Sequence, residues 1–497
     1  MSMEPIHPSV TAWLKEAPKK MLIGGQPETA LSGQTFLSIN PSDGRPLAEV
    51  AQGGVEDVDR AVAAARGAAE KWAATAPAER ERLLRRFAAL IEEHAGELAQ
   101  LETLDNGKPL SHTRQIDVRV AANQVYYHAA WPSRLVGETV PVSIPNLFVY
   151  TRREPVGVVA LIIPWNYPLI HSMQKVSPAL ATGNTVILKP ASVASLACLR
   201  LGELALAAGF PPGVFNVITG PGPVIGQALA AHPQIDKVQI TGSTAVGREI
   251  IRSSAVNIKR ISLELGSKAP NAIFADADLE LAIPGAFRAA FGNTGQSCVA
   301  GARLFVESPI YDRVVERFVD MAGKAVIGNA MDLTTELGPI IDGKQYETIC
   351  GYIQTGQEEG ARLLTGGNRL APPAVPEGGY YLPPSIFVGA SDGARISQEE
   401  IFGPVVNIYR FSTEDELVER ANATTYGLAA GLWTRDLARA HRVSARIKAG
   451  VVWVNTYDLF APNVPFGGYK QSGYGRDNSQ AVIEAVTELK SVWISTK

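Results

Sequence analysis

Cysteine and histidine are scarce in this chain. Its 497 residues include three cysteines and seven histidines, with no Cys-x-x-Cys pair. An odd number of widely spaced cysteines supports neither a disulfide framework nor a structural zinc site. Reduced thiols are typical of the cytoplasm. We therefore predict a cytoplasmic protein without a metal site.

The chain also lacks an excess of charge and any long apolar run. Its formal net charge is -3 and no Lys/Arg-rich run occurs, which argues against a nucleic-acid partner. The most apolar run, Val156 to Ile163, is too short to cross a bilayer. The N-terminus has no basic segment followed by an apolar one, so no signal peptide is expected. We expect neither a nucleic acid nor a membrane as a partner.

What the chain does contain is enough length for two or three domains. Apolar helical patterns cover residues 56–72, 78–104 and about 114–131. From residue 155, short apolar strands alternate with helices, and a second such series runs from about 269 to 453. This alternation predicts an α/β fold with parallel sheets that are covered on both faces.

A polar segment interrupts this pattern. Residues 135–152 predict a two-stranded ribbon, and Leu489 to Ser495 predicts a C-terminal strand. An isolated ribbon is marginally stable in water. We expect it to pair with another subunit; the alternative is an edge strand within the same chain.

Cys298 differs from the other two cysteines. It follows Gly295-Gln296-Ser297, a combination that builds a turn and not a packed face. Most free cysteines are small buried hydrophobic side chains, which is the expectation for Cys198 and Cys350. A thiol becomes a nucleophile where its surroundings favour thiolate and a second group handles protons. Cys298 is the candidate nucleophile.

Two polar residues at strand ends could assist this thiol. Asn166 follows the strand that ends near Ile163, on the side where ligands bind in such sheets. It could donate to an oxyanion or simply cap the next helix. Glu264 is a lone carboxylate in an apolar strand, and burial would raise its pKa toward that of a general base. Its alternative is a structural ion pair with Lys268 or another cation.

Three further loops follow strands and could hold a nucleotide. Lys189-Pro190-Ala191-Ser192 suits a ribose or phosphate. The stretch from Gly242 to Gly247 opens a helix whose N–H groups could hold a pyrophosphate. The stretch from Gly220 to Gly226 looks like a dinucleotide fingerprint, but its spacing and prolines fit poorly, so we interpret it as a coincidental match.

Seven ordered motifs carry a resemblance to a known family. They are PWNYP at 164–168, ILKP at 187–190, TGSTAVG at 241–247, LELG at 263–266, GQSC at 295–298, EEIFGP at 399–404 and PFGGYKQSGYGRD at 465–477. With these motifs the chain resembles the aldehyde dehydrogenase superfamily over essentially its whole length, most closely the broad-range and betaine-aldehyde-type group. The resemblance implies a Rossmann-like cofactor domain (1–134 and 153–265), an α/β catalytic domain (266–465) and a β-ribbon oligomerisation element (135–152 and 480–497).

The resemblance also implies a reaction and its residues. Cys298 would be the nucleophile, Asn166 and the Cys298 N–H the oxyanion hole, and Glu264 the base for the deacylating water. Lys175 and Asp477 would form a supporting proton-relay pair, with Asp in place of the more usual Glu. An aldehyde would be oxidised to a carboxylic acid through a thiohemiacetal and a thioester, in a homodimer or homotetramer. NAD(P)+ would contact Ile163, Pro164, Trp165, Lys189, Ser192, Gly222, Gly242, Ser243, Val246, Glu264, Leu265, Gly266, Glu400 and Phe402.

Two departures from the family pattern bear on these expectations. Position 267 is Ser where relatives usually have Gly, which would cost roughly 1 kcal/mol if the backbone there needs a positive φ. Ser192 stands where NAD-specific relatives usually carry Glu, a residue that repels a 2′-phosphate. The chain is therefore expected to accept NADP+ as well as NAD+.

The aldehyde itself is predicted from the expected tunnel, which is formed by Tyr167, His171, Gln174, Val299, Tyr457, Phe460 and Phe466. His171 and Gln174 replace Met and Trp of many relatives; the alternative is that both point at solvent. No fixed positive charge suits a semialdehyde carboxylate, and losing Trp at 174 weakens an aromatic cage for quaternary ammonium. An aromatic or medium-chain aldehyde is expected.

Two other functions remain as alternatives. In a CoA-acylating relative, CoA instead of water would take the acyl group; such relatives typically lack the base at the position of Glu264. A catalytically silent binding or structural relative would not need Cys298, Glu264 and Asn166 together. The presence of all three favours a hydrolytic dehydrogenase.

Overall fold

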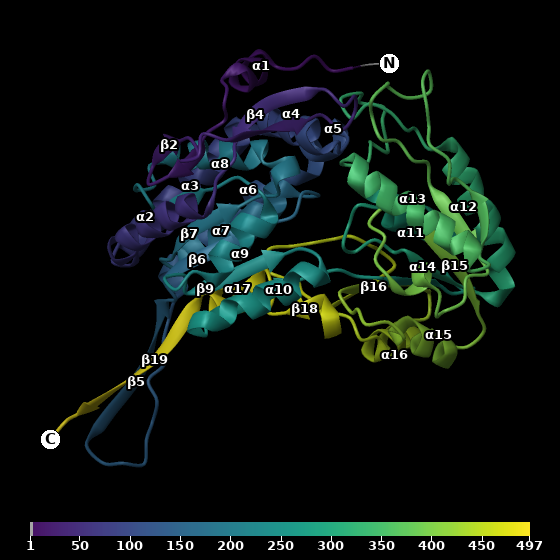
Figure 1. Cartoon of the computed structure of the whole chain (residues 1–497). Coiled ribbons are helices and arrows are strands. Elements are labelled where there is room, and N and C mark those ends of the chain that lie inside the picture. The colour runs from purple at the N-terminus through teal and green to yellow at the C-terminus, as the bar shows by residue number, and fades with distance from the viewer. Residues whose placement is uncertain (1–2) are drawn as a thin grey trace.

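Two mostly parallel sheets organise the chain in the computed structural model, which describes residues 3–497. Figure 1 shows them as two lobes, one formed by the earlier part of the chain and one by the green segments, with a two-stranded arm projecting from the body. The predicted α/β class is confirmed. Within the described residues, no helix is both long and apolar enough to cross a membrane.

The first sheet has the strand order β18-β10-β9-β6-β7-β8-β1-β2. Its five central strands, from β10 to β8, are parallel, and the three outer pairings, β18–β10, β8–β1 and β1–β2, are antiparallel. The strands are β1 (Met21–Ile23), β2 (Gln26–Glu28), β6 (Val158–Ile162), β7 (Thr185–Lys189), β8 (Phe215–Val217), β9 (Lys237–Thr241), β10 (Arg260–Glu264) and β18 (Gly473–Tyr474).

Helices cover both faces of this sheet, which is why β6, β7, β8 and β9 are buried along their whole length. Along β6, Val159 and Leu161 pack into one hydrophobic cluster, while Val158, Ala160 and Ile162 pack into another on the opposite face. The first cluster includes α3 (Pro77–Glu93), α4 (Ala95–Asn106), α6 (Val118–Ala129), α7 (Pro168–Ala181) and α8 (Leu196–Ala208). The second includes α2 (Val55–Ala73), α9 (Gln227–Ala231) and α10 (Thr244–Ser254).

The second sheet has the order β13-β14-β15-β12-β11-β16-β17 and is parallel except for β13. Its strands are β11 (Pro270–Ile273), β12 (Arg303–Glu307), β13 (Arg362–Thr365), β14 (Ser385–Val388), β15 (Val405–Phe411), β16 (Ala429–Trp433) and β17 (Val451–Val454). Its helices are α11 (Leu279–Phe291), α12 (Tyr311–Lys324), α13 (Gly343–Glu358), α14 (Arg395–Gln398), α15 (Glu414–Asn422) and α16 (Leu437–Arg446). Residues 265–269 connect the sheets, so the predicted domain division at 265/266 falls in this connection.

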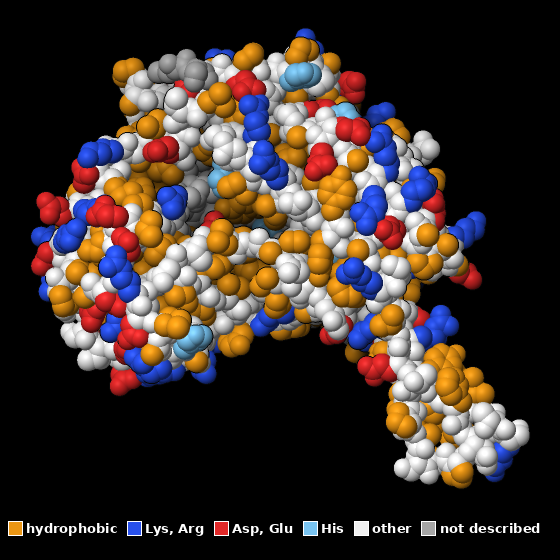
Figure 2. Space-filling view, turned by 180° about the vertical axis from the view of Figure 1, so that it is seen from behind, with side chains coloured by type: hydrophobic (Ala, Val, Ile, Leu, Met, Phe, Trp, Pro, Cys, Tyr) orange, Lys and Arg blue, Asp and Glu red, His pale blue; other side chains and the backbone are white. Residues whose placement is uncertain are grey.

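The arm corrects the prediction for residues 135–152. Only β5 (Leu147–Pro155) is a long strand there, and its partner is the C-terminal strand β19 (Thr487–Ser495), paired antiparallel along its whole length. Residues 138–140 make only short contacts with the other edge of β5. A local pattern cannot reveal a partner strand so far along the chain. The side chains of Leu489 and Trp493 are 60% and 54% exposed, and Figure 2 shows hydrophobic side chains along the protruding arm.

Two of the helical predictions also need correction. The helix expected over 78–104 is broken at His94, whose φ of -101° and ψ of 19° are not helical, while the apolar stripe continues across the break. The third helical region starts earlier than expected, with α5 (Leu110–His112) and a π-turn over Thr113–Asp117 before α6. The remaining elements are α1 (Pro8–Lys15), β3 (Thr35–Ile39), β4 (Pro46–Ala51) and α17 (Ser479–Ala485).

Candidate active site

Cys298 lies in a loop that follows α11 and enters the cleft between the two lobes. Asn293, Thr294 and Gly295 all adopt positive φ, of 51°, 55° and 70°. A Cβ on Gly295 would lie 2.2 Å from the Gly403 carbonyl oxygen, so this position needs glycine. The turn predicted from small polar residues is therefore present, and it leaves the Cys298 side chain half-buried. Cys198 is buried and Cys350 is partly buried, in agreement with a packing role.

Asn166 is buried against this loop. Its Nδ2 donates to the Gln296 carbonyl oxygen at 3.1 Å, and the Asn293 side chain donates to the same oxygen at 3.2 Å. Tyr167, not Asn166, is the N-cap residue of α7, and no side chain caps that helix. The helix-cap alternative for Asn166 is therefore wrong. The structure holds a side-chain donor beside the residues that precede Cys298.

Glu264 ends β10 and is almost completely buried. Neither carboxylate oxygen accepts a hydrogen bond of ordinary geometry among the described residues, and no ion pair with Lys268 occurs there. Gly467 approaches so closely that a Cβ on it would lie 2.6 Å from Glu264 Oε1. Burial, and then the negative charge of Asp477, raise the pKa of Glu264 well above its usual value, while Lys175 and Arg476 oppose this shift. The ion-pair alternative is therefore wrong, and these surroundings favour the protonated form of Glu264.

Lys175 and Asp477 form the buried pair that the resemblance implied. Lys175 Nζ donates to Asp477 Oδ2 at 2.6 Å, and both side chains are inaccessible to solvent. Lys175 lies on α7, and Asp477 lies in the loop that precedes α17. Both charges act on the pKa of Glu264, although they come from parts of the chain that are 302 residues apart.

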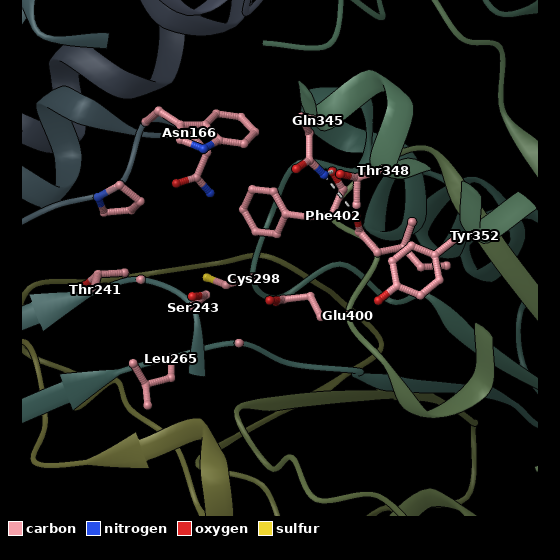
Figure 3. A pocket seen from close by; sticks show the side chains of 15 residues that line it. Asn166, Thr241, Ser243, Leu265, Cys298, Gln345, Thr348, Tyr352, Glu400 and Phe402 are labelled. Carbon is pink, nitrogen blue, oxygen red and sulfur yellow. Dashed lines mark hydrogen bonds between the residues drawn. The ribbon is translucent and has the colours of Figure 1, made fainter. Parts of the chain in front are cut away.

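A cleft of about 270 Å³ extends from Cys298. Figure 3 shows the sulfur of Cys298 among side chains from both lobes, with Asn166 and Phe402 on one side and Ser243 and Glu400 nearby. Most of the residues that are predicted to contact the cofactor near Cys298 line this cleft. Its lining residues are Pro164, Trp165, Asn166, Thr241, Gly242, Ser243, Leu265, Gly266, Cys298, Gln345, Thr348, Tyr352, Glu400, Ile401 and Phe402.

The cleft has the features that a dinucleotide requires. Gly242 and Ser243 lie where β9 ends and α10 begins, and Ser243 caps that helix through the Val246 N–H at 3.3 Å. A helix N-terminus preceded by glycine favours phosphate groups. Trp165 and Phe402 meet edge to face, with ring centroids 5.2 Å apart. The wall of the cleft is completed by α13, through Gln345, Thr348 and Tyr352. These residues could not be predicted from the sequence because they belong to no motif.

Glu400 crosses from the second lobe to the connection between the sheets. Its Oε1 accepts the Ser267 N–H at 2.8 Å, and a Cβ on Gly266 would lie 2.5 Å from its Oε2. Burial raises the pKa of Glu400 to about 7. Ser267 is not among the residues with positive φ, so the backbone strain considered for that position is absent.

Lys189, Ser192 and Gly222 lie together at the ends of β7 and its neighbours. Burial lowers the pKa of Lys189 to about 8. Ser192 Oγ donates to the Gly220 carbonyl oxygen at 2.7 Å, and a Cβ on Gly222 would lie 3.9 Å from Lys189 Nζ. The Ile163 N–H donates to the Lys189 carbonyl oxygen at 3.1 Å. The glycine stretch treated as a coincidental fingerprint therefore borders the ammonium group of Lys189.

The predicted tunnel residues group on the other side of Cys298. Val299, Phe466 and Tyr457 pack together with Trp453, which sequence reasoning missed within an apolar strand. The Tyr457 hydroxyl donates to the Val299 carbonyl oxygen at 2.8 Å, and Phe460 lies 5.4 Å from Phe466 between ring centroids.

Two of the residues predicted for the tunnel are polar groups on α7. His171 and Gln174 are only 7% and 5% exposed, so the alternative that they point at solvent is wrong. Burial lowers the pKa of His171 to about 3, which keeps the ring neutral. The ring lies 6.1 Å from that of Tyr167. Asp458, a single carboxyl between aromatic positions, was also missed; burial raises its pKa to about 6.

Comparison with known proteins agrees with this geometry. The model of the aldehyde dehydrogenase family matches residues 29–492. The mitochondrial aldehyde dehydrogenase of Homo sapiens is 46% identical over 96% of this chain and 92% of its own length. A NAD+ complex of a Bacillus cereus aldehyde dehydrogenase is 46% identical, with a TM-score of 0.97 over 100% of both chains. An indole-3-acetaldehyde dehydrogenase of P. syringae is 42% identical, with a TM-score of 0.94 over 97% of this chain and 98% of that one.

The chain belongs to the aldehyde dehydrogenase family. It is an oxidoreductase that acts on aldehydes, with NAD(P)+ as the oxidant.

Proposed function

We propose that Cys298, Asn166 and Glu264 carry out the two halves of a hydrolytic aldehyde oxidation. The observation that carries this proposal is that Cys298 and Asn166 line one cleft, and Glu264 directly precedes Leu265 and Gly266 of the wall of that cleft. Glu264 is buried, and neither of its carboxylate oxygens has a hydrogen-bond partner of ordinary geometry among the described residues, which leaves them free to take a proton from water once Glu264 is ionised.

In the first half-reaction, the Cys298 thiol loses its proton to solvent. The thiolate sulfur then bonds to the aldehyde carbon, and the electron pair of the carbonyl π bond moves to the oxygen, which becomes an oxyanion. The Asn166 Nδ2–H, which now donates to the Gln296 carbonyl, and the Cys298 N–H are donors for that oxygen. When bound, the nicotinamide cofactor supplies the hydride acceptor that converts the thiohemiacetal into a thioester.

In the second half-reaction, Glu264 takes a proton from water and the water oxygen attacks the thioester carbon. The carbon–sulfur bond then breaks, the electron pair returns to Cys298 and the carboxylic acid leaves. The buried Lys175–Asp477 pair supports Glu264 electrostatically. Glu264 favours water over CoA as the acyl acceptor, because CoA transfer does not need a base to activate water.

Glu264→Gln tests this assignment, because it should separate the two half-reactions. A burst of NAD(P)H of about one equivalent per site should survive, followed by slow steady-state turnover. Rapid mixing without CoA measures both phases. Cys298→Ser is the matched control and should lose the burst and the turnover while still binding cofactor. Loss of the burst in Glu264→Gln would place Glu264 before acylation, and unchanged turnover would make it a structural carboxyl.

We propose in addition that the enzyme accepts both NAD+ and NADP+. Ser192 carries no charge and is occupied in a hydrogen bond to Gly220, while the Lys189 ammonium lies next to Gly222 and forms no ion pair among the described residues. A 2′-phosphate would therefore meet a positive charge with no carboxylate from Ser192 opposing it.

We also propose an aromatic or medium-chain aldehyde as substrate, acted on by a cytoplasmic homodimer or homotetramer. The aromatic group of Trp453, Tyr457, Phe460 and Phe466 supports this substrate class, and the P. syringae relative is named for an aromatic aldehyde. The exposed hydrophobic side chains of the β5–β19 arm support assembly. A panel of aldehydes assayed with both cofactors tests the substrate class.

A further inference from the structure

Asp477 makes a second hydrogen bond whose partner belongs to no motif of the sequence. Its Oδ2 accepts from Lys175, and its Oδ1 accepts from Gln239 Nε2. Its backbone is fixed as well, because Asp477 and Phe466 exchange N–H···O bonds of 2.7 and 2.9 Å. The carboxylate is therefore held from three directions: from α7, from β9 and from its own backbone.

Gln239 is an unusual residue for its position. It occupies the middle of β9, a central parallel strand whose residues are all buried, and its own side chain is completely inaccessible. Burial of an amide is costly unless its hydrogen bonds are made. Gln239 Nε2 donates to Asp477 Oδ1, while Gln239 Oε1 has no partner among the described residues. This arrangement indicates that the contact with Asp477 accounts for the presence of a buried side-chain amide at position 239.

The contact affects Glu264 through charge. Lys175 lowers the pKa of Glu264, and Asp477 raises it, so the position of the pair sets how readily Glu264 gives up its proton. The other charged or titratable groups around the pair are Lys237 on β9, which donates to Ser262 Oγ at 2.7 Å, Arg476, and neutral His171 on α7. None of these groups holds Asp477 Oδ1.

We propose that Gln239 is a positioning residue for deacylation: by fixing Asp477 Oδ1 it holds the Lys175 ammonium where that charge supports Glu264. This inference rests on the proposed role of Glu264. It also implies that Gln239 and Asp477 are matched in length, since a longer acid at 477 would have to enter the space that the Gln239 amide fills in a close-packed interior.

Gln239→Met tests the hydrogen bond, because it keeps the volume and removes the donor. We expect kcat to fall about tenfold, as for the loss of one hydrogen bond to a buried charge, and the acid limb of the deacylation rate to move up by about one pH unit. The NAD(P)H burst and cofactor affinity should not change. Gln100→Met is the matched control, since Gln100 is a buried glutamine whose partners His7, Pro5 and Glu4 all belong to the N-terminal segment, and it should behave as wild type.

A set of size-exchange variants tests the matching. Gln239→Ala and Asp477→Glu should each slow deacylation, whereas Gln239→Ala combined with Asp477→Glu should recover most of the rate and return the acid limb toward its wild-type position. Thermal unfolding confirms that each variant is folded. A folded Gln239→Met enzyme with an unchanged kcat and acid limb would overturn the proposal, and so would a double variant as slow as the product of the single effects.

The burst separates failure of this inference from failure of the proposed function. If Glu264→Gln leaves steady-state turnover unchanged, the role of Glu264 is wrong and the proposal falls with it. If Glu264→Gln behaves as expected and Gln239→Met loses its burst along with its turnover, Glu264 keeps its role and the positioning of deacylation by Gln239 is rejected.

Discussion

Cys298 and Glu264 both reside in surroundings that favour their protonated forms. Burial, followed by the charges of Glu400, Asp458 and Glu264, raises the pKa of the Cys298 thiol. Burial and Asp477 raise the pKa of Glu264. Each group must lose its proton to act, so each half-reaction should slow on acidification, at its own pH.

The pH dependence of turnover follows from the sign of these shifts. Because the pKa of Glu264 is raised well above 4.5, hydrolysis should decline as the pH falls through a value well above 4.5. Lys175→Met should move that limb further upward, since the charge that lowers the pKa of Glu264 is lost. Single-turnover deacylation rates between pH 5 and 9 measure both. A limb that stays near pH 4.5 in both proteins would contradict the role of burial.

Ser192→Glu should shift cofactor use toward NAD+. A carboxylate beside the Lys189 ammonium would repel a 2′-phosphate and offer acceptors to ribose hydroxyls. One like charge at close range in a partly exposed site costs about 1–4 kcal/mol, so NADP+ use should fall at least about tenfold relative to NAD+. Ser192→Ala is the uncharged control. Measured kcat/KM ratios that are equal in wild type and Ser192→Glu would show that Ser192 does not set cofactor choice.

Individual residues could be predicted where an unusual side chain stands out from a local pattern. Cys298 does so in a small polar turn, Asn166 after an apolar strand and Glu264 within one, and the structure brings Cys298 and Asn166 to one cleft. Trp453 could not be singled out, because an apolar residue in an apolar strand looks like any core residue. Gln239 could not be interpreted either, since its partner Asp477 lies 238 residues away.

At the scale of elements, α4 and α6 are joined to α7 by a buried charge network. Lys108 Nζ donates to Glu102 at 3.1 Å and to Asp117, and it lies 3.7 Å above the Tyr167 ring. Glu102 Oε2 accepts the Leu169 N–H at 3.1 Å. Although burial alone would raise the pKa of Asp117, Lys108 and His112 lower it. The network therefore fixes the start of α7, next to Asn166.

Lys108→Met should destabilise the protein by about 3–5 kcal/mol, because it leaves two buried carboxyl groups without their cation. Denaturant unfolding followed by fluorescence measures the loss. Lys324→Met, which removes an exposed pair with Asp320, is the control and should cost less than about 1 kcal/mol. Equal stability of the two variants would show that Lys108 contributes no more than a surface charge.

Most elements could be predicted because their signals are local. Strand and helix periods identified the alternation from β6 to α10, and Gly107, with a φ of 78°, ends α4 where the Asp-Asn-Gly sequence predicted a stop. The break at His94 carries no such signal. The prediction of a ribbon within residues 135–152 was wrong because β5 takes its partner from the opposite end of the chain.

At the scale of the whole molecule, the arm has apolar side chains that a single chain leaves exposed. Its two strands pair with each other through their backbones, yet the side chains of Phe148, Leu489 and Trp493 remain exposed. Exposed apolar side chains and free strand edges favour contact with another protein surface. The arm is therefore expected to be covered in an assembly.

Deletion of residues 489–497 should yield smaller and poorly soluble species, because β5 would lose its partner and expose an edge. Size-exclusion chromatography with light scattering measures the change in mass. Deletion of residues 496–497 alone, beyond β19, is the control and should leave the assembly intact. An unchanged mass after the longer deletion would mean that β19 is not an interface element.

The return of the chain to the first sheet has a consequence for biosynthesis. Residues Gly473 and Tyr474 pair with β10 at Glu264, and Asp477 meets Lys175 from 302 residues further along the chain. A ribosome therefore releases Cys298 long before Asp477, the partner of Lys175, exists. Until translation is nearly finished, the growing polypeptide has the proposed nucleophile without β18 or the carboxylate that pairs with Lys175, so a prematurely terminated chain is not expected to form the complete site.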